Sequence, residues 1–161
     1  MTDQFKGRLR GVEDQIEAKD PTAFDEAVKL TEQYPEEAEA WNTLAYANDS
    51  KRDYPAAIAA MTRAMKLRPG RPALHFTRGG YSLMAGDYDS AIADFTEGLA
   101  LGNHLEREPY REVLYFLRAE AYYQLGRKAE ARADLEHVAD DCTFWTVQVR
   151  SKAELVALCA E

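Results

Sequence analysis

The sequence repeats itself at a fixed spacing, and this repeat constrains the fold more than any other feature. Residues 38–69 align with residues 72–103 at an offset of 34, and an Asp-Tyr pair, an Ala-Ile pair and a leucine coincide in that alignment. Toward the C-terminus the offset becomes 40, which brings Gly86 onto Gly126. Such self-similarity is the signature of a solenoid, whose stacked units bury a continuous core. The sequence therefore predicts a stack of similar units.

The repeats share an order of residue types, although Gly98 and Asn103 replace the alanine and the proline in the second repeat. An aromatic opener is followed by a small residue four positions later, by Gly or Asp-Tyr at a turn, and then by alanine, a large apolar residue, a small residue and proline. The matching positions are Trp41, Ala45, Asp53, Tyr54, Ala57, Met61, Ala64 and Pro69, then His75, Gly79, Gly86, Asp87, Tyr88, Ala91 and Phe95, then Tyr115, Ala119, Tyr122, Gly126, Ala131 and Leu135. This pattern resembles the tetratricopeptide repeat, a helix–turn–helix unit of 34 residues. The resemblance implies an all-α, right-handed superhelix of antiparallel helix pairs (an α-solenoid), with about nine helices that include a C-terminal capping helix.

The whole chain, residues 1–161, is predicted to form a single domain of this kind. It divides into a degenerate repeat at about 4–37, repeats at 38–71, 72–105 and 112–142, and a capping helix at 143–159. Apolar spacing and the positions of proline and glycine predict helices near 3–18, 21–34, 37–49, 54–67, 71–84, 88–101, 109–125, 127–139 and 143–159. A solenoid needs a terminal helix of this kind to close its open core.

Composition limits the classes of partner. The formal net charge of −8 argues against nucleic acid and against anionic membrane surfaces, because both attract basic proteins. No apolar run approaches the roughly 20 residues of a membrane span, and the N-terminus lacks the apolar segment of a signal peptide. The only cysteines, Cys142 and Cys159, do not make a secreted disulfide framework. We therefore expect a cytoplasmic protein with reduced thiols.

The glycines of residues 75–95 look at first like a phosphate-binding loop. Such a loop needs a preceding strand and a G-x-G-x-x-G or G-x-x-x-x-G-K-T pattern, and the sequence has neither. Gly79 instead occupies the position where the two helices of a repeat cross closely, and Gly86 ends a helix. His137 and Cys142 lack the further ligands of a zinc site, and no nucleophile and base are placed to converge. We expect no enzymatic activity, metal or cofactor.

Two arginines stand among residues that otherwise suit a core. The residues sixteen apart in the three repeats are Leu44 with Ala60, Arg78 with Asp94, and Arg118 with Asp134. Leucine accompanies alanine, whereas each arginine accompanies an aspartate, and residues at this separation face each other across a helical hairpin. The pattern predicts two structural ion pairs within repeats, which stabilise little overall but leave a stranded charge when one partner is removed. Binding of an acidic ligand by these arginines is the alternative.

The first helix of each repeat is expected to line the concave side of the superhelix. The residues expected to face a partner there are Asn42, Tyr46, Asp49, Phe76, Thr77, Leu83, Met84, Val113, Phe116, Leu117, Glu120 and Tyr123. This surface is polar at one end and apolar and aromatic at the other, which suits an extended or helical peptide with apolar anchors. The alternative is that neighbouring repeats or the last helix bury some of these residues.

The predicted function is a non-enzymatic adaptor or scaffold that binds a peptide of another protein in this groove. A secretion-type chaperone or a co-chaperone is an alternative. The carboxylate clamp of the family's chaperone-binding branch is not expected, because Tyr46, Thr77, Val113 and Leu117 stand where that branch carries lysine, asparagine or arginine. A self-assembling structural protein is the other alternative, with an apolar stripe of residues 144–158 forming a homodimer.

Overall fold

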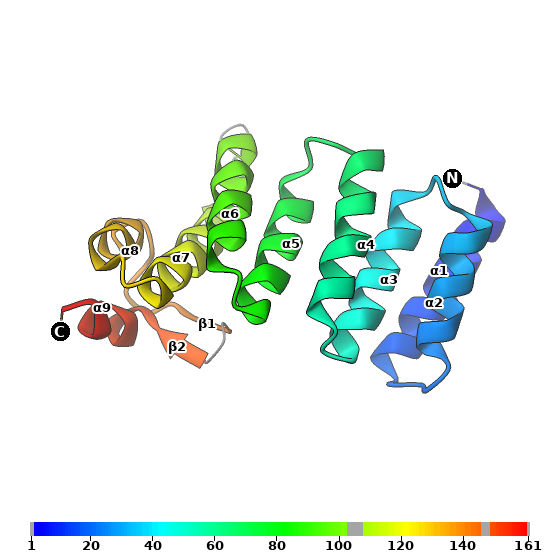
Figure 1. The fold of residues 1–161 in the computed structure, drawn as a ribbon, viewed down its shortest axis with the longest axis horizontal. Coiled ribbons are helices and arrows are strands. Elements are labelled where there is room, and N and C mark those ends of the chain that lie inside the picture. Colours follow the sequence, from blue (N-terminus) through cyan, green and yellow to red (C-terminus); the bar gives the residue numbers. More distant parts are fainter. Residues whose placement is uncertain (1, 103–107, 146–148, 161) are drawn as a thin grey trace. The chain divides into compact units, whose positions relative to one another are not determined.

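A computed structural model describes residues 2–102, 108–145 and 149–160 of the chain. The chain comprises two compact units, residues 1–70 (unit 1) and residues 71–161 (unit 2), and each unit is described by itself. Within the described ranges there are nine helices and one short β-hairpin (Figure 1). The architecture is all-α and is built from antiparallel helix pairs, as predicted.

Unit 1 contains two helix pairs. They are formed by α1 (Asp3–Glu17), α2 (Ala23–Gln33), α3 (Ala38–Ser50) and α4 (Tyr54–Leu67). The side chain of Thr2 caps α1 by accepting from the amide of Phe5, and Asp53 caps α4 by accepting from the amide of Ala56. These bonds satisfy amides that would otherwise lack a partner at the start of a helix.

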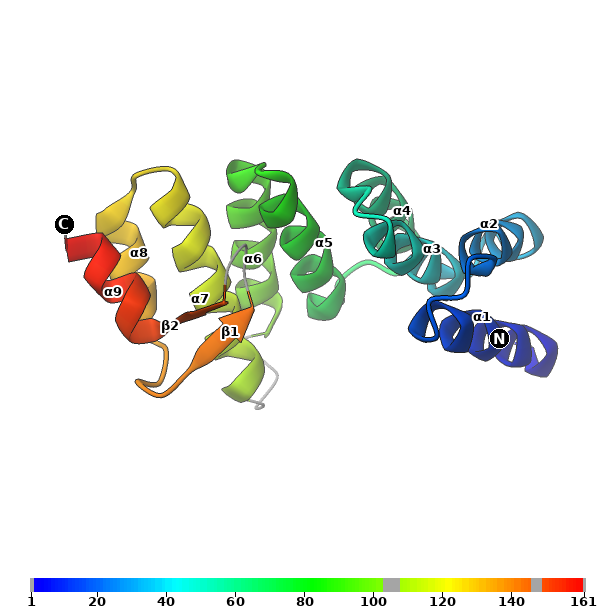
Figure 2. The ribbon, with the colours of Figure 1, turned by 90° about the horizontal axis from the view of Figure 1, so that it is seen from below.

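The core of unit 1 lies where α1, α2 and α3 meet. Phe5, Ala27, Leu30 and Ala40 are fully buried there, and Val12 is nearly so. These residues recur at helical spacing along their helices, so each helix turns one apolar face toward the others. Figure 2 shows α1 and α2 side by side, with α3 following them. The packing fixes α1 against α3, which positions the candidate site described below.

Unit 2 contains two further helix pairs and a C-terminal extension. Its elements are α5 (Pro72–Ala85), α6 (Tyr88–Gly102), α7 (Glu108–Gln124), α8 (Lys128–Leu135), β1 (Thr143–Trp145), β2 (Val149–Ser151) and α9 (Lys152–Ala160). One apolar cluster, around Phe95 and Leu114, joins α5, α6 and α7. A second, around Phe116 and Leu135, joins α7 and α8 to the extension. Each helix of this unit therefore packs on its neighbour in the sequence.

Glycine serves two different purposes in unit 2. A Cβ atom added to Gly79 would lie 2.7 Å from Cε1 of Phe95 and 3.1 Å from Cβ of Asp94, so α5 and α6 cross closely at this point. Gly86 and Gly126 have φ angles of 80° and 72°, the left-handed conformation that glycine adopts without steric cost. Both roles were predicted from the repeat.

The first seven helices begin and end within about two residues of the predicted positions, whereas the end of the chain differs. The helix predicted over 127–139 ends at Leu135, and the capping helix predicted over 143–159 is wrong in its first half. Residues Thr143–Trp145 and Val149–Ser151 pair as antiparallel strands, with Phe144 opposite Arg150, and only Lys152–Ala160 is helical. Residues 146–148 of the prediction lie outside the described residues.

The physical reason for this difference lies in the residue types. The segment from Thr143 to Val149 is rich in β-branched and aromatic residues, which lose rotamer freedom in a helix and suit a strand. Lys152 then fixes the end of the hairpin. Its amide donates to the carbonyl of Cys142, and its Nζ lies 2.7 Å from both the carbonyl oxygen of Val138 and Oδ1 of Asp140.

Candidate functional site

Each of the two helix pairs of unit 1 has a first helix, α1 or α3, and these two helices border a groove. We define the α1–α3 groove by its lining residues, which are Glu13, Ile16 and Glu17 from α1 and Thr43, Tyr46, Asp49 and Ser50 from α3. The groove has a volume of about 390 Å³. Spacings of three and four place each set of residues on one face of its helix. Tyr46 is 44% exposed, so its ring is accessible.

The groove is negatively charged. Three carboxylates line it, and its lining residues include no lysine, arginine or histidine. Burial raises the pKa of Asp49. Burial also raises the pKa of Glu13, as do the charges of Asp14 and Glu17, and Arg10 lowers it by less. Glu13 and Glu17 are four residues apart on one helix, where like charges repel. The fold therefore holds these charges together without compensation from the groove itself.

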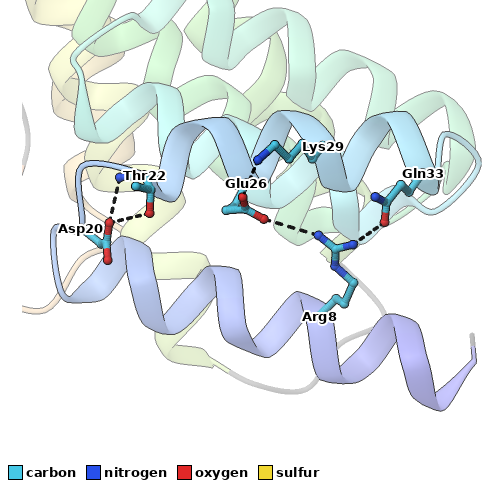
Figure 3. Close-up of polar contacts among 6 residues, drawn as sticks. All are labelled: Arg8, Asp20, Thr22, Glu26, Lys29 and Gln33. Carbon is cyan, nitrogen blue, oxygen red and sulfur yellow. Dashed lines mark hydrogen bonds and ion pairs between the residues drawn. The ribbon is translucent and has the colours of Figure 1, made fainter.

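Two cations of the α1–α2 pair, Arg8 and Lys29, bind partners outside the groove. Arg8 of α1 reaches across to α2, where it donates to Oε1 of Gln33 and lies 3.4 Å from Oε2 of Glu26 (Figure 3). Nζ of Lys29 lies 2.7 Å from the other carboxylate oxygen of Glu26. These contacts join α1 to α2. They leave the carboxylates of the groove outside the ion-pair network of the α1–α2 pair.

A second pocket of unit 1, of about 690 Å³, adjoins the groove, because Ile16 and Ser50 line both. Two of its four charged lining residues, Asp20 and Lys51, have side-chain contacts within the chain. Asp20 accepts from the amide of Thr22 at 2.8 Å and from its hydroxyl at 2.6 Å (Figure 3), and these bonds lower the pKa of the Asp20 carboxyl. Nζ of Lys51 lies 3.6 Å from the ring centre of a phenylalanine of α2. We therefore place the candidate site in the α1–α3 groove.

The residues predicted for the first repeat lie on the expected face of α3. Tyr46 and Asp49 line the groove, and Asn42 lies one turn earlier on the helix, half-buried. No residue of α1 was predicted to face a partner. The signal was present, because Glu13, Ile16 and Glu17 share one face of a helix that begins a repeat.

The residues predicted for the second repeat divide between surface and core. Met84 of α5 is 43% exposed, and Phe76 and Thr77 are half-buried. Leu83 is buried in the cluster that contains Phe95, so its expected place on a binding surface is wrong. Phe76 packs against the same cluster. The face of α5 that a partner can reach is therefore narrower than predicted.

In the third repeat, more of the residues predicted to face a partner are buried. Phe116 and Glu120 of α7 are fully buried and Leu117 is nearly so, whereas all three were expected to face a partner. Val113 and Tyr123 are half-buried.

The chain's own C-terminal extension covers part of this face of α7. The ring of Phe116 lies 5.0 Å from that of Phe144 in β1, and Leu155 and Cys159 of α9 belong to the same apolar cluster. Leu117 packs instead into the cluster that joins α7 to α5 and α6. The alternative of self-burial, left open by the sequence, therefore holds for this helix, and we do not retain it as a binding face.

The structure forms both Arg–Asp pairs inferred from the repeat. Nε of Arg78 lies 2.8 Å from Oδ2 of Asp94 and its Nη2 lies 2.7 Å from Oδ1. The Arg118–Asp134 pair has the same two distances. Both aspartates are 5% exposed, and the hydrogen bonds to them raise the pKa of each guanidinium. Each pair joins the two helices of one repeat with the geometry of a bidentate salt bridge.

Comparison with known proteins agrees with this architecture. A family model described as "Tetratricopeptide repeat" matches residues 22–72 and 49–106, and a second model with that description matches residues 113–140. The chain belongs to the tetratricopeptide repeat family. The matched ranges cover the helix pairs α3–α4 and α5–α6 and most of α7–α8, and the family assigned from residue pattern alone is confirmed.

Several protein chains of known structure share this fold. One is described as "Crystal structure of MamA protein", with a TM-score of 0.72 and 22% identity over 83% of this chain and 70% of that chain. At that identity the likeness shows the fold alone. No curated protein sequence matches the chain.

The described ranges of this tetratricopeptide repeat chain contain no group of three or more histidine, cysteine, aspartate or glutamate residues that could hold a metal ion. No helix of residues 2–102, 108–145 or 149–160 is long and apolar enough to cross a membrane. A shallow pocket of unit 2, of about 330 Å³, is lined by Arg111, Glu112, Tyr115 and His137, but the last two stack on each other at 4.3 Å.

Proposed function

We propose that this tetratricopeptide repeat chain is a non-enzymatic adaptor that binds a peptide segment of another protein in the α1–α3 groove. The repeats of this family are protein-interaction scaffolds, which supports a protein as the partner. The observation that carries the proposal is the exposed ring of Tyr46 beside a groove between two first helices. An aromatic side chain offers a large apolar contact at low conformational cost, as in binding hot spots. A cytoplasmic location is part of the proposal.

Site-specific photocrosslinking tests the proposal. A photoreactive phenylalanine analogue replaces Tyr46 in the full chain inside living cells, and crosslinked peptides are identified by mass spectrometry. We expect crosslinks to one defined segment of another protein. The matched control places the analogue at Leu125, which is 38% exposed at the turn before α8. The same segments recovered from both positions, or none from position 46, would contradict the proposal.

The alternative of self-assembly has its own outcome in this experiment. Residues 144–158 were predicted to offer an apolar stripe to a second copy, and Val156 of α9 is 39% exposed. Leu155 of the same helix is buried within unit 2, so it is not available to a second copy. Crosslinks from position 156 to a second copy of the chain, with none from position 46, would favour assembly over adaptor function.

A further inference from the structure

We infer that the segment bound by the α1–α3 groove is cationic, with lysine or arginine residues placed beside an apolar anchor. This inference rests on the proposed function and specifies its partner. The groove has an accessible aromatic ring, three carboxylates and a depth set by two packed helices. These features favour a bound segment that carries both an apolar side chain and a positive charge.

The carboxylates of the groove have no partner inside the described part of the chain. No hydrogen bond or ion pair there engages the side chains of Glu13, Glu17 or Asp49. Two other acidic residues of unit 1 differ from them in this respect. Asp20 accepts two bonds from Thr22, and Glu26 is bound by Arg8 and Lys29 (Figure 3). Three carboxylates without a hydrogen-bond or ion-pair partner among the described residues are thus gathered in one groove between α1 and α3.

This arrangement costs folding free energy. Glu13 and Glu17 repel each other across one helical turn, and burial disfavours the ionised form of Glu13 and of Asp49. A bound ammonium or guanidinium group would remove both costs, because an opposite charge favours the ionised carboxylate. An anionic segment would add a further like charge to the same site. The electrostatics therefore favour a cationic occupant over an anionic one.

The apolar part of the groove determines which side chains of the segment can pack there as an anchor. Tyr46 and Ile16 approach the groove from opposite helices, and Thr43 is 1% exposed with its hydroxyl bonded to the carbonyl of Glu39. The hydroxyl of Thr43 is therefore already satisfied, and the floor presents mainly carbon atoms to a ligand. Long basic side chains suit this composition, since their methylene stems cover apolar surface while the charged heads reach carboxylates.

Selection from a library of short random-sequence peptides against the full chain tests the inference. We expect the enriched peptides to carry net positive charge and an apolar residue. Their affinity should fall about tenfold or more in the triple variant Glu13→Gln, Glu17→Gln, Asp49→Asn, since three partly exposed charge pairs are lost together. Their affinity should also fall with rising salt concentration.

A matched variant controls for overall charge. Glu32→Gln, Asp89→Asn and Glu97→Gln remove three exposed carboxylates outside the groove, and affinity should stay within about twofold of the parent. If the groove variant is poorly folded by circular dichroism, the single change Asp49→Asn carries the test, with an expected loss of about threefold.

The outcomes separate this inference from the proposed function. Peptides that lose affinity with Tyr46→Ala but are neutral or acidic, or that bind the triple groove variant as tightly as the parent, overturn the inference and leave the groove as the binding site. A selection in which no enriched peptide depends on Tyr46 overturns the proposed function, and the inference with it.

Discussion

The helix pairs α3–α4 and α5–α6 are built to the same plan with different residues at the crossing point. In α3–α4 the two positions are occupied by Leu44 and Ala60, whereas the corresponding residues of α5–α6 are Arg78 and Asp94, joined by two hydrogen bonds. The third pair, α7–α8, repeats the ionic solution with Arg118 and Asp134. One backbone arrangement therefore accepts either apolar contact or a salt bridge, provided that both partners change together.

The same comparison reveals a second coupling, of volume rather than charge. The residues that cross next to these positions are Ala45 with Met61, Gly79 with Phe95, and Ala119 with Leu135. All six are buried. The largest residue, Phe95, stands opposite the smallest, because an added Cβ at position 79 would meet its ring at 2.7 Å. Sequence differences between repeats are thus compensated within each helix pair.

The largest expected effect is the loss of one member of an ion pair. Asp94→Ala leaves the guanidinium of Arg78 half-buried without its carboxylate, and we expect a loss of about 2–4 kcal/mol in unfolding free energy. The double change Arg78→Leu plus Asp94→Ala reproduces the residues of α3–α4 and should recover most of that loss. Chemical denaturation of the parent, both single variants and the double variant measures the coupling. Additive losses would show that the pair is not coupled.

The second effect tests the volume coupling. Gly79→Ala forces a methyl group against the ring of Phe95, and we expect destabilisation of about 1–3 kcal/mol. Adding Phe95→Met gives α5–α6 the Ala–Met combination found in α3–α4, which should restore part of the stability. The comparison is made by thermal and urea unfolding. A Gly79→Ala variant as stable as the parent would mean that α5 and α6 separate readily, contrary to the close crossing.

These couplings also explain how much the sequence could predict. The helix pairs and their turns follow from the residues that the repeats share. The ion pairs follow from differences between repeats, since a charge that appears in one helix requires its partner in the next. The burial of Phe116 could not be found in this way, because its partner Phe144 lies outside the repeats. The hairpin from Thr143 to Ser151 was hidden by the expectation of a capping helix, although its β-branched and aromatic residues favour strands.

The residues of the α1–α3 groove could also be predicted only in part. The prediction of Tyr46 and Asp49 came from a complete repeat, and both line the groove. The residues of α1 belong to a degenerate repeat that matches the others at the 34-residue offset only in its second helix, so no alignment pointed to them. Their placement depends on how α1 packs through Phe5 and Val12 against its neighbours, which is a property of the folded unit.

The third effect has the opposite sign. Arg52 stands in α3–α4 where α5–α6 has Gly86, and both adopt the left-handed conformation, with φ angles of 58° and 80°. A side chain there costs about 1 kcal/mol relative to glycine, so Arg52→Gly should stabilise the protein by roughly 0.5–1 kcal/mol. Gly86→Ala should destabilise by a similar amount. Thermal unfolding of the two variants checks the pair, and equal signs would exclude backbone strain as the cause.

The smallest effect separates the two partners of Asp94. Oδ1 of Asp94 lies 3.1 Å from Nδ1 of His75 as well as 2.7 Å from Nη2 of Arg78. His75→Tyr introduces the aromatic residue that opens the third repeat, and because Arg78 still satisfies both carboxylate oxygens, we expect a loss of less than about 1 kcal/mol. If His75→Tyr and Arg78→Ala lower the unfolding free energy equally, as measured by urea unfolding at neutral pH, His75 contributes as much as Arg78 to the stability of the buried Asp94 carboxylate. The ionic crossing of α5–α6 would then be a three-residue network, whereas the corresponding aspartate of α7–α8, Asp134, is bound by Arg118.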